Sequence, residues 1–290
     1  MRLRRAALRA ALLGLTGVLL AAAPASHADG GLRSAVAPGP HLIFDDEFNG
    51  LAGSSPNLAN WAHVLGGGGF GTHELESNTD LISNAHLDGA GHLLIVARRQ
   101  DYTGPDGVRR QYTSARLITR TGDFVYGRAE IRAKFPPGMG LWPAFFAMGG
   151  TSLAPTWPIT GEYDLMEGTG EAPNLSTATA HGPIFGPGQT RYHGVSGHYQ
   201  IVGQDWLPRP LSAGFHVYAV DVSPGLLTFS LDGVPYLSVT PASLPPGGGW
   251  VFNSPVYFVL DLAVGSWGGP PGRTAFPKSL IVDYVRIYAG

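Results

Sequence analysis

The chain has 290 residues and no cysteine, so disulfide bonds and thiolate chemistry are excluded. Only 14% of its residues are charged, with 19 basic against 21 acidic residues. Without a basic cluster, such a chain is a poor candidate for binding nucleic acid or an anionic membrane, and a polysaccharide fits better as a partner. Its length allows a core that is stable without cross-links, and we expect a monomer.

Residues 1–28 have the pattern of a secretory signal peptide. Four arginines precede an apolar run from Ala10 to Ala23, and Ser26-His27-Ala28 fits a small-x-small cleavage site. The run is short for a membrane-spanning helix. We therefore expect secretion, with cleavage after about Ala28. The 15 basic and 21 acidic residues that remain give a formal net charge of −6. Residues 29–40 are expected to form a flexible leader.

From His41 onward, strand-like runs alternate with turn signals such as Asp88-Gly89 and Asp232-Gly233. The first begins at His41, and the others are residues 92–97, 112–119, 124–135, 141–148, 162–167, 176–181, 192–199, 215–222, 226–231, 256–264 and 281–288. No stretch has a sustained helical period. The pattern predicts an all-β fold, an antiparallel β-sandwich formed by one domain over residues 41–290.

The most informative run is Gly161-Glu162-Tyr163-Asp164-Leu165-Met166-Glu167-Gly168, which holds three carboxylates within six residues. Side chains alternate along a strand, so Glu162 and Asp164 share a face and Glu167 would point to the other. One extra residue at Leu165-Met166, a β-bulge, would bring Glu167 back beside the first two. We therefore predict a bulged strand with three carboxylates on one face.

Three crowded carboxylates cannot all be ionised in a partly desolvated cleft. One acid held neutral beside a carboxylate nucleophile is the equipment for cleaving a glycosidic bond with retention, for which the two groups lie about 5–5.5 Å apart. A solvent-facing acidic strand is the simpler alternative, because the motif is short. The apolar and aromatic surroundings on a chain poor in charge favour catalysis. The glycine run at residues 66–71 lacks the Lys-Ser/Thr ending of a phosphate loop, and a loop beside a ligand fits it better.

Nine segments occur in an order that a known family shares. They are residues 45–50, the glycine-rich loop with 74–76, 112–117, 126–130, 140–146, the acidic run, 215–220, 231–233 and 282–286. On these segments, which span about residues 41–289, the chain resembles glycoside hydrolase family 16. It resembles in particular the laminarinase-like branch of secreted endo-β-1,3-glucanases, although the bulged spacing is shared by the laminarinase, agarase and carrageenase branches and is absent from the lichenase branch.

The resemblance implies a β-jelly roll with an open concave cleft and a retaining double displacement. Glu162 would be the nucleophile, Glu167 the acid/base, and Asp164 the residue that tunes their protonation. The implied substrate is a β-linked glucan, foremost β-1,3-glucan, cleaved internally and without a catalytic cofactor.

The resemblance also implies residues that contact the substrate. Trp142 would stack on a sugar, with a core tryptophan as the alternative. His181 would lie near the catalytic subsites, although a purely structural role is equally open. Glu74 and Arg116 would shape the glycone side of the cleft, unless they form a buried ion pair that braces strands. Further cleft positions are Phe70, Phe146 and Trp267.

Two acidic residues match positions that hold a structural calcium in many relatives. These are Glu47 and Asp283. Calcium takes six to eight oxygen ligands, so two residues far apart in sequence support such a site only weakly. The resemblance therefore offers calcium as an optional structural ion.

Several positions that are expected to contact the substrate depart from the family pattern. Phe70 and Phe146 stand where many relatives have Trp, His73 stands where they have Asn, and residues 184–188 differ. The polymer is therefore left open between β-1,3-glucan, mixed-linkage glucan and a β-galactan or agar-type chain, with transglycosylation as another outcome. The alternative of a different class is a non-catalytic, lectin-like β-sandwich.

Overall fold

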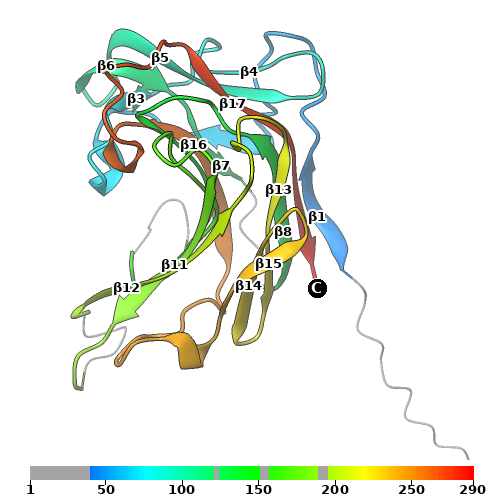
Figure 1. Ribbon diagram of the computed structural model, residues 1–290, viewed down its shortest axis with the longest axis vertical. Helices are drawn as coiled ribbons and strands as arrows, with labels where there is room; N and C mark the ends of the chain where they lie inside the picture. The colour runs from blue at the N-terminus through cyan, green and yellow to red at the C-terminus, as the bar shows by residue number, and fades with distance from the viewer. Residues whose placement is uncertain (1–39, 121–123, 151–156, 189–194) are drawn as a thin grey trace, which may run out of the picture. The chain divides into compact units, whose positions relative to one another are not determined.

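The computed structural model describes residues 40–120, 124–150, 157–188 and 195–290 (Figure 1). The predicted signal peptide, and the leader up to residue 39, lie outside the described residues. Within the described ones, no helix combines the length and apolar character needed to cross a bilayer.

Two β-sheets make up the described fold, as the sequence predicts. The first has ten strands in the order β15-β14-β13-β8-β17-β5-β6-β3, with β1 beside β17 and β4 beside β5. The second has seven, in the order β12-β11-β10-β9-β16-β7-β2. All described pairs are antiparallel except β3 with β6. Figure 1 shows β11 and β12 in one layer and β8, β13, β14 and β15 in the other.

The strands of the ten-stranded sheet have these bounds: β1 His41–Asp46, β3 Glu76–Asn78, β4 Ala85–Leu87, β5 Leu93–Thr103, β6 Arg109–Ser114, β8 Gly127–Lys134, β13 His216–Ser223, β14 Leu226–Leu231, β15 Val234–Val239 and β17 Lys278–Ala289. Those of the seven-stranded sheet are β2 Trp61–His63, β7 Arg116–Thr119, β9 Leu141–Gly149, β10 Glu162–Glu167, β11 Leu175–Ile184, β12 Gly197–Trp206 and β16 Val256–Val264. The described residues also form three short 3-10 helices, η1 Gly69–Gly71, η2 Pro241–Ser243 and η3 Ser266–Gly268.

The main core lies between the two sheets, because each strand turns one set of alternate side chains toward the other sheet. On β8, Ala129, Ile131 and Ala133 are fully buried. On β10, Tyr163 and Leu165 enter the same core. The opposite face of the seven-stranded sheet holds a second, small apolar cluster around Phe146 and Val259. Since β16 contributes to both clusters, all nine of its residues are buried.

The structure corrects two strand predictions. Residues 112–119 were predicted as one strand, but β6 and β7 lie in different sheets with the fully buried Ala115 between them. Of the strand predicted at residues 192–199, residues 192–194 lie outside the described residues, and β12 continues to Trp206. The three-residue strands β2, β3 and β4 were not predicted, because they are too short to show a period. Strand β15, which directly follows the Asp232-Gly233 turn, was not predicted either.

Candidate active site

A β-bulge in β10 places the three carboxylates of the acidic run on one face. Asp164 pairs with Phe146 of β9, whereas Glu167 pairs with Ala144, so three steps on β10 match two on β9. The same shift occurs against β11. Leu165 and Met166 are both fully buried in the core. The predicted bulge is thus confirmed. It forms because both apolar residues at the bulge, Leu165 and Met166, are buried in the core.

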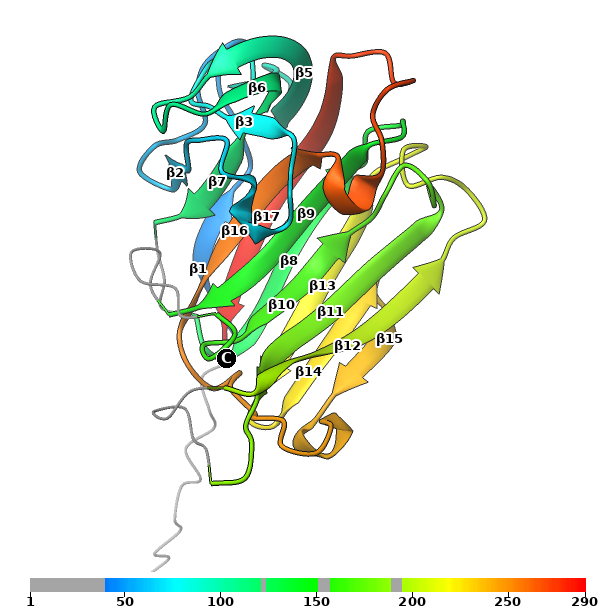
Figure 2. The same ribbon diagram turned by 90° about the vertical axis from the view of Figure 1, so that its left-hand side faces the viewer.

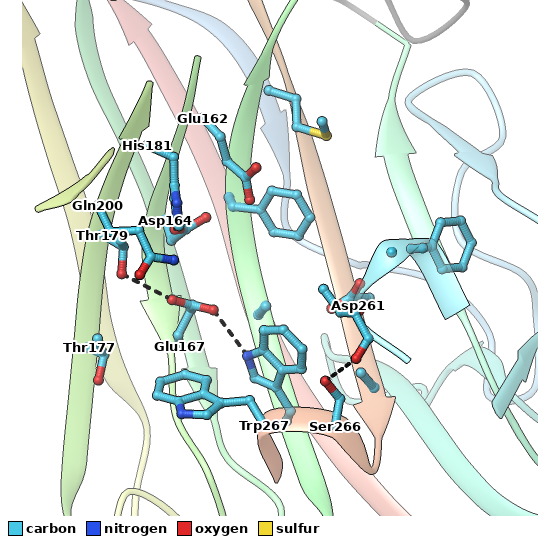
Figure 3. A pocket seen from close by; sticks show the side chains of 18 of the residues that line it. Glu162, Asp164, Glu167, Thr177, Thr179, His181, Gln200, Asp261, Ser266 and Trp267 are labelled. Atoms are coloured by element: carbon cyan, nitrogen blue, oxygen red, sulfur yellow. Dashed lines mark hydrogen bonds and ion pairs between the residues drawn. The ribbon is translucent and has the colours of Figure 1, made fainter. Parts of the chain in front are cut away.

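The carboxylates line a cleft of about 750 Å³ that crosses the seven-stranded sheet from Arg116 on β7 to Gln204 on β12. Figure 2 shows this sheet face-on, and Figure 3 shows the site from close by. The structure gathers ten of the predicted site residues on this cleft: Glu162, Asp164, Glu167, Trp142, Phe146, His181, Phe70, Glu74, Arg116 and Trp267.

Glu167 is held by two donors in a nearly dry environment. Trp142 Nε1 donates to one carboxylate oxygen at 3.1 Å, and Thr179 Oγ1 lies 3.4 Å from the other (Figure 3). Burial raises the pKa of Glu167 well above its ordinary value, and the charge of Asp164 raises it further. His181 and the Trp142 hydrogen bond act in the opposite direction. The arrangement therefore favours a protonated Glu167 that can donate its proton.

Asp164 lies between the two glutamates and is almost completely buried. Its Oδ2 atom is 3.0 Å from Nε2 of His181. Burial, followed by the charge of Glu162, raises the pKa of Asp164 well above its ordinary value. Glu162 is the more exposed of these two carboxylates, so burial acts mainly against a charge on Asp164.

Glu162, Asp164 and His181 also have the composition of a small cation site. One oxygen or nitrogen from each lies within 4.8 Å of the other two. Among the described residues, this is the one group of three His, Asp or Glu side chains that meets such a spacing. Acidic groups this close are common without an ion, so the geometry indicates shared protons as readily as a metal.

Aromatic side chains form the walls of the cleft. Trp142 meets Trp267 edge-to-face with ring centroids 5.7 Å apart. Trp267 is 43% exposed, so one side of it is free for a ligand. Trp157, also 43% exposed, lies 4.9 Å from the ring of His198. Trp142 is therefore a cleft residue that touches Glu167, and the alternative of a core tryptophan is wrong.

The buried ion pair considered for Arg116 exists, but with a different partner. Arg116 pairs with Asp261, its register neighbour on β16, and not with Glu74. The guanidinium also lies over Phe70, at 4.4 Å from the ring centroid, and over Phe146, at 5.2 Å. The pKa of Asp261 is raised to about 7 because the effect of burial exceeds the opposing effect of the Arg116 charge.

Glu74 is buried and accepts a hydrogen bond from Thr72 Oγ1 at 2.7 Å. Its other oxygen is buried without a hydrogen-bond partner among the described residues. Burial and the neighbouring charge of Glu74 raise the pKa of Glu76 well above its ordinary value. Glu74, Glu76 and Asp261 thus form a second cluster of acidic side chains at this end of the cleft, near Arg116.

The two residues matched to a calcium position do not fit one. Both carboxylate oxygens of Glu47 accept hydrogen bonds from Arg286, at 2.7 and 3.0 Å. Asp283 pairs with Arg132. A cation at either residue would have to displace a guanidinium, so calcium binding there stays a prediction without support from this geometry.

Sequence reasoning missed cleft residues on β12 and β16. They are His198, Gln200, Val202 and Gln204 on β12, and Asp261 on β16, together with Trp157. Asp261 had a signal, because it is the single charged residue in a strand that otherwise reads as core. The β12 residues had none, since the strand was predicted too early in the chain.

Comparisons with known proteins identify the family of this chain. A sequence model of the glycosyl hydrolases family 16 matches residues 77–286. A beta-glucanase of Rhodothermus marinus is 36% identical over 88% of this chain and 87% of its own length. The laminarinase catalytic domain from Thermotoga maritima is 32% identical with a TM-score of 0.73, covering 87% of this chain and 98% of that one. The endo-beta-1,3-glucanase from Pyrococcus furiosus is 35% identical with a TM-score of 0.74, covering 86% and 94%.

Proposed function

Because this chain belongs to glycosyl hydrolases family 16, we propose that it cleaves β-1,3-linked glucan chains internally, with retention of anomeric configuration. The observation that supports this best is the bulged β10, which aligns Glu162, Asp164 and Glu167 on the floor of one cleft. The linkage is supported by the relatives named for β-1,3-glucan and laminarin. A cleft that crosses the sheet to its β12 edge suits a polymer bound along its length.

In the proposed mechanism, the carboxylate of Glu162 attacks the anomeric carbon and forms a glycosyl ester. Glu167 gives its proton to the oxygen of the departing chain. The raised pKa of Glu167 keeps that proton in place before the reaction. Glu167, now a carboxylate, then takes a proton from water as the water opens the ester. No cofactor enters either step.

Asp164, which lies beside His181, would control where protons lie between the two glutamates. When Asp164 is neutral, it can share a hydrogen bond with Glu162 and keep the nucleophile in position. As the ester forms, Glu162 loses its charge, and the electrostatic repulsion that opposes ionisation of Asp164 becomes weaker. Asp164 is thus a positioning residue in this proposal.

The proposal includes secretion, with cleavage of the N-terminal segment after about Ala28, and a monomeric enzyme. A β-galactan-type polymer remains the second candidate, because Phe70 and Phe146 depart from the family pattern and lie beside Arg116 in the cleft.

The test is release of reducing ends from laminarin, mixed-linkage β-glucan, agarose and carrageenan. Glu162→Gln and Glu167→Gln should each abolish release. Glu171→Gln, an exposed glutamate outside the carboxylate group, serves as the matched control. N-terminal sequencing of the protein recovered from the medium reads the cleavage site, and NMR of the first product identifies its anomer.

Highest release from laminarin, with the β-anomer appearing first, supports the proposal. Highest release from agarose or carrageenan would overturn the substrate and keep the mechanism. Binding to the polymers without release by the parent protein would overturn catalysis in favour of a lectin-like role.

A further inference from the structure

The edge strand β12 turns one set of side chains into the cleft. His198, Gln200, Val202 and Gln204 line it. The intervening residues face the other sheet: Tyr199 is buried in the core, and a Cβ on Gly203 would lie 2.5 Å from Leu237. The pairing of β12 with β11 has no irregularity up to Leu175 opposite Trp206. Trp206 therefore lies on the same face as Gln204.

Trp206 is 65% exposed, the largest exposed fraction of the tryptophans that the structure describes as exposed. Within the described ranges, no aromatic ring or cation stacks on its indole. Packing in the core therefore does not account for a tryptophan at this position. A large apolar ring at the rim of a ligand cleft gains burial only when something covers it.

The strand register relates Trp206 to the proposed acid/base. Ala144, Glu167, Thr177 and Gln204 are neighbours in one row across β9, β10, β11 and β12. Trp142 on β9 and Trp206 on β12 each lie two residues beyond this row in the same direction. Figure 2 shows that the arrowheads of β10 and β12 point to the same end of the sheet.

Adjacent strands are about 4.8 Å apart, so β12 lies about 10 Å from β10 and about 14 Å from β9. Trp206 thus stands beyond the residues that surround Glu167, on the side of the cleft opposite Arg116. Gln204 beside it offers an amide donor and an acceptor for sugar hydroxyls.

We propose that Trp206 is a sugar-stacking platform at the β12 edge of the cleft, which binds a glucose unit distant from the cleaved bond. This inference rests on the proposed function, because it extends the same cleft. The indole covers the apolar face of the pyranose while the hydroxyls keep their hydrogen bonds at the ring edge. Long chains reach this platform and short ones do not, so Trp206 favours polymer over short oligosaccharide.

The experiment measures binding of β-1,3-gluco-oligosaccharides of increasing length by calorimetry, with Glu162→Gln as the non-cleaving background. Trp206→Ala is added to that background, together with Trp206→Tyr, which keeps a ring. Val234→Ala, which truncates an exposed side chain on β15 of the other sheet, is the control.

We expect Trp206→Ala to weaken binding about five- to tenfold, and only above a threshold length, with most of the affinity restored in Trp206→Tyr. Val234→Ala should follow the background at every length. Equal loss at all lengths, or no loss at any length, would overturn the proposal. A dimer that Trp206→Ala dissociates in sedimentation would overturn it in favour of contact with a second copy.

Failure of the proposed function has a different signature. The protein with Glu162 intact would then release no reducing ends from laminarin, whatever residue stands at position 206. In that case the length series is run with fragments of the polymer that the protein cleaves or binds, and the same threshold decides the role of Trp206.

Discussion

Trp142 donates its indole hydrogen to Glu167, with 3.1 Å between Nε1 and Oε1. Trp142 is thus both a wall of the cleft and a direct partner of the proposed acid/base. A donor to a carboxylate stabilises the ionised form, and this contact lowers the pKa of Glu167 against the larger, opposing effect of burial. The same residue can therefore affect substrate binding and the protonation of the site.

We predict that Trp142→Phe moves the basic limb of the pH profile of kcat/KM to higher pH. Phe keeps a ring but has no N–H, so the pKa of Glu167 rises further and its proton is kept to higher pH. The hydrogen bond from Trp142 stabilises the carboxylate that Glu167 becomes as it gives up its proton, so losing it predicts a fall in kcat/KM of about tenfold. Trp267→Phe, which removes a neighbouring indole without a hydrogen bond to Glu167, should leave the limb in place. An unchanged limb in Trp142→Phe would contradict the prediction.

Asp164→Asn should move the same limb in the opposite direction. In its ionised form Asp164 raises the pKa of Glu167, and Asn keeps a similar shape but cannot ionise. The proton of Glu167 is then lost at lower pH. The pH profiles of Asp164→Asn and Trp142→Phe are measured on the same substrate, so that each variant checks the other. If the basic limb moves in the same direction in both variants, Glu167 is not the group that titrates.

The bulge and the shared acidic face could be predicted from the sequence because they depend on local parity. A strand with period two and one extra residue leaves few arrangements for Glu162, Asp164 and Glu167. The two apolar residues of the bulge, Leu165 and Met166, have only the core to enter.

Other features depend on long-range pairing and could not be predicted. The alternation of residues 112–119 is the same whether they form one strand or cross between sheets at Ala115. Arg116 has many acidic residues available in the sequence, and only the register of β7 with β16 selects Asp261. Trp206 could be placed on the same face as the cleft residues of β12 only when the bounds of that strand were known.

Asp164→Asn should also make stability less sensitive to pH. The pKa of Asp164 is raised in the folded protein, so above its ordinary value of 3.8 the folded state holds a proton that the unfolded chain has released. The free energy of unfolding therefore falls as pH rises through this range. Asn removes up to one such proton, which is about 1.4 kcal/mol per pH unit.

Urea unfolding at several pH values above 4 measures this slope. Asp101→Asn, which removes an exposed carboxyl group on β5, is the control and should leave the slope as in the parent. A slope equally steep in Asp164→Asn and the parent would show that Asp164 does not hold this proton in the folded state.

The ion pair between Arg116 and Asp261 gives a final prediction, on stability and binding together. Arg116→Met removes the cation and leaves Asp261 buried alone, so its pKa should rise above about 7 and unfolding should become easier by about 3–5 kcal/mol. Arg116→Met with Asp261→Leu removes both charges, and most of the stability should return because no buried charge is left unpaired. Substrate affinity should stay low in both variants, since the guanidinium over Phe70 and Phe146 is lost in each. Urea unfolding and KM on the preferred polymer separate the two effects. If affinity recovers together with stability in the double variant, Arg116 only braces the strands, and the cleft role assigned to it is wrong.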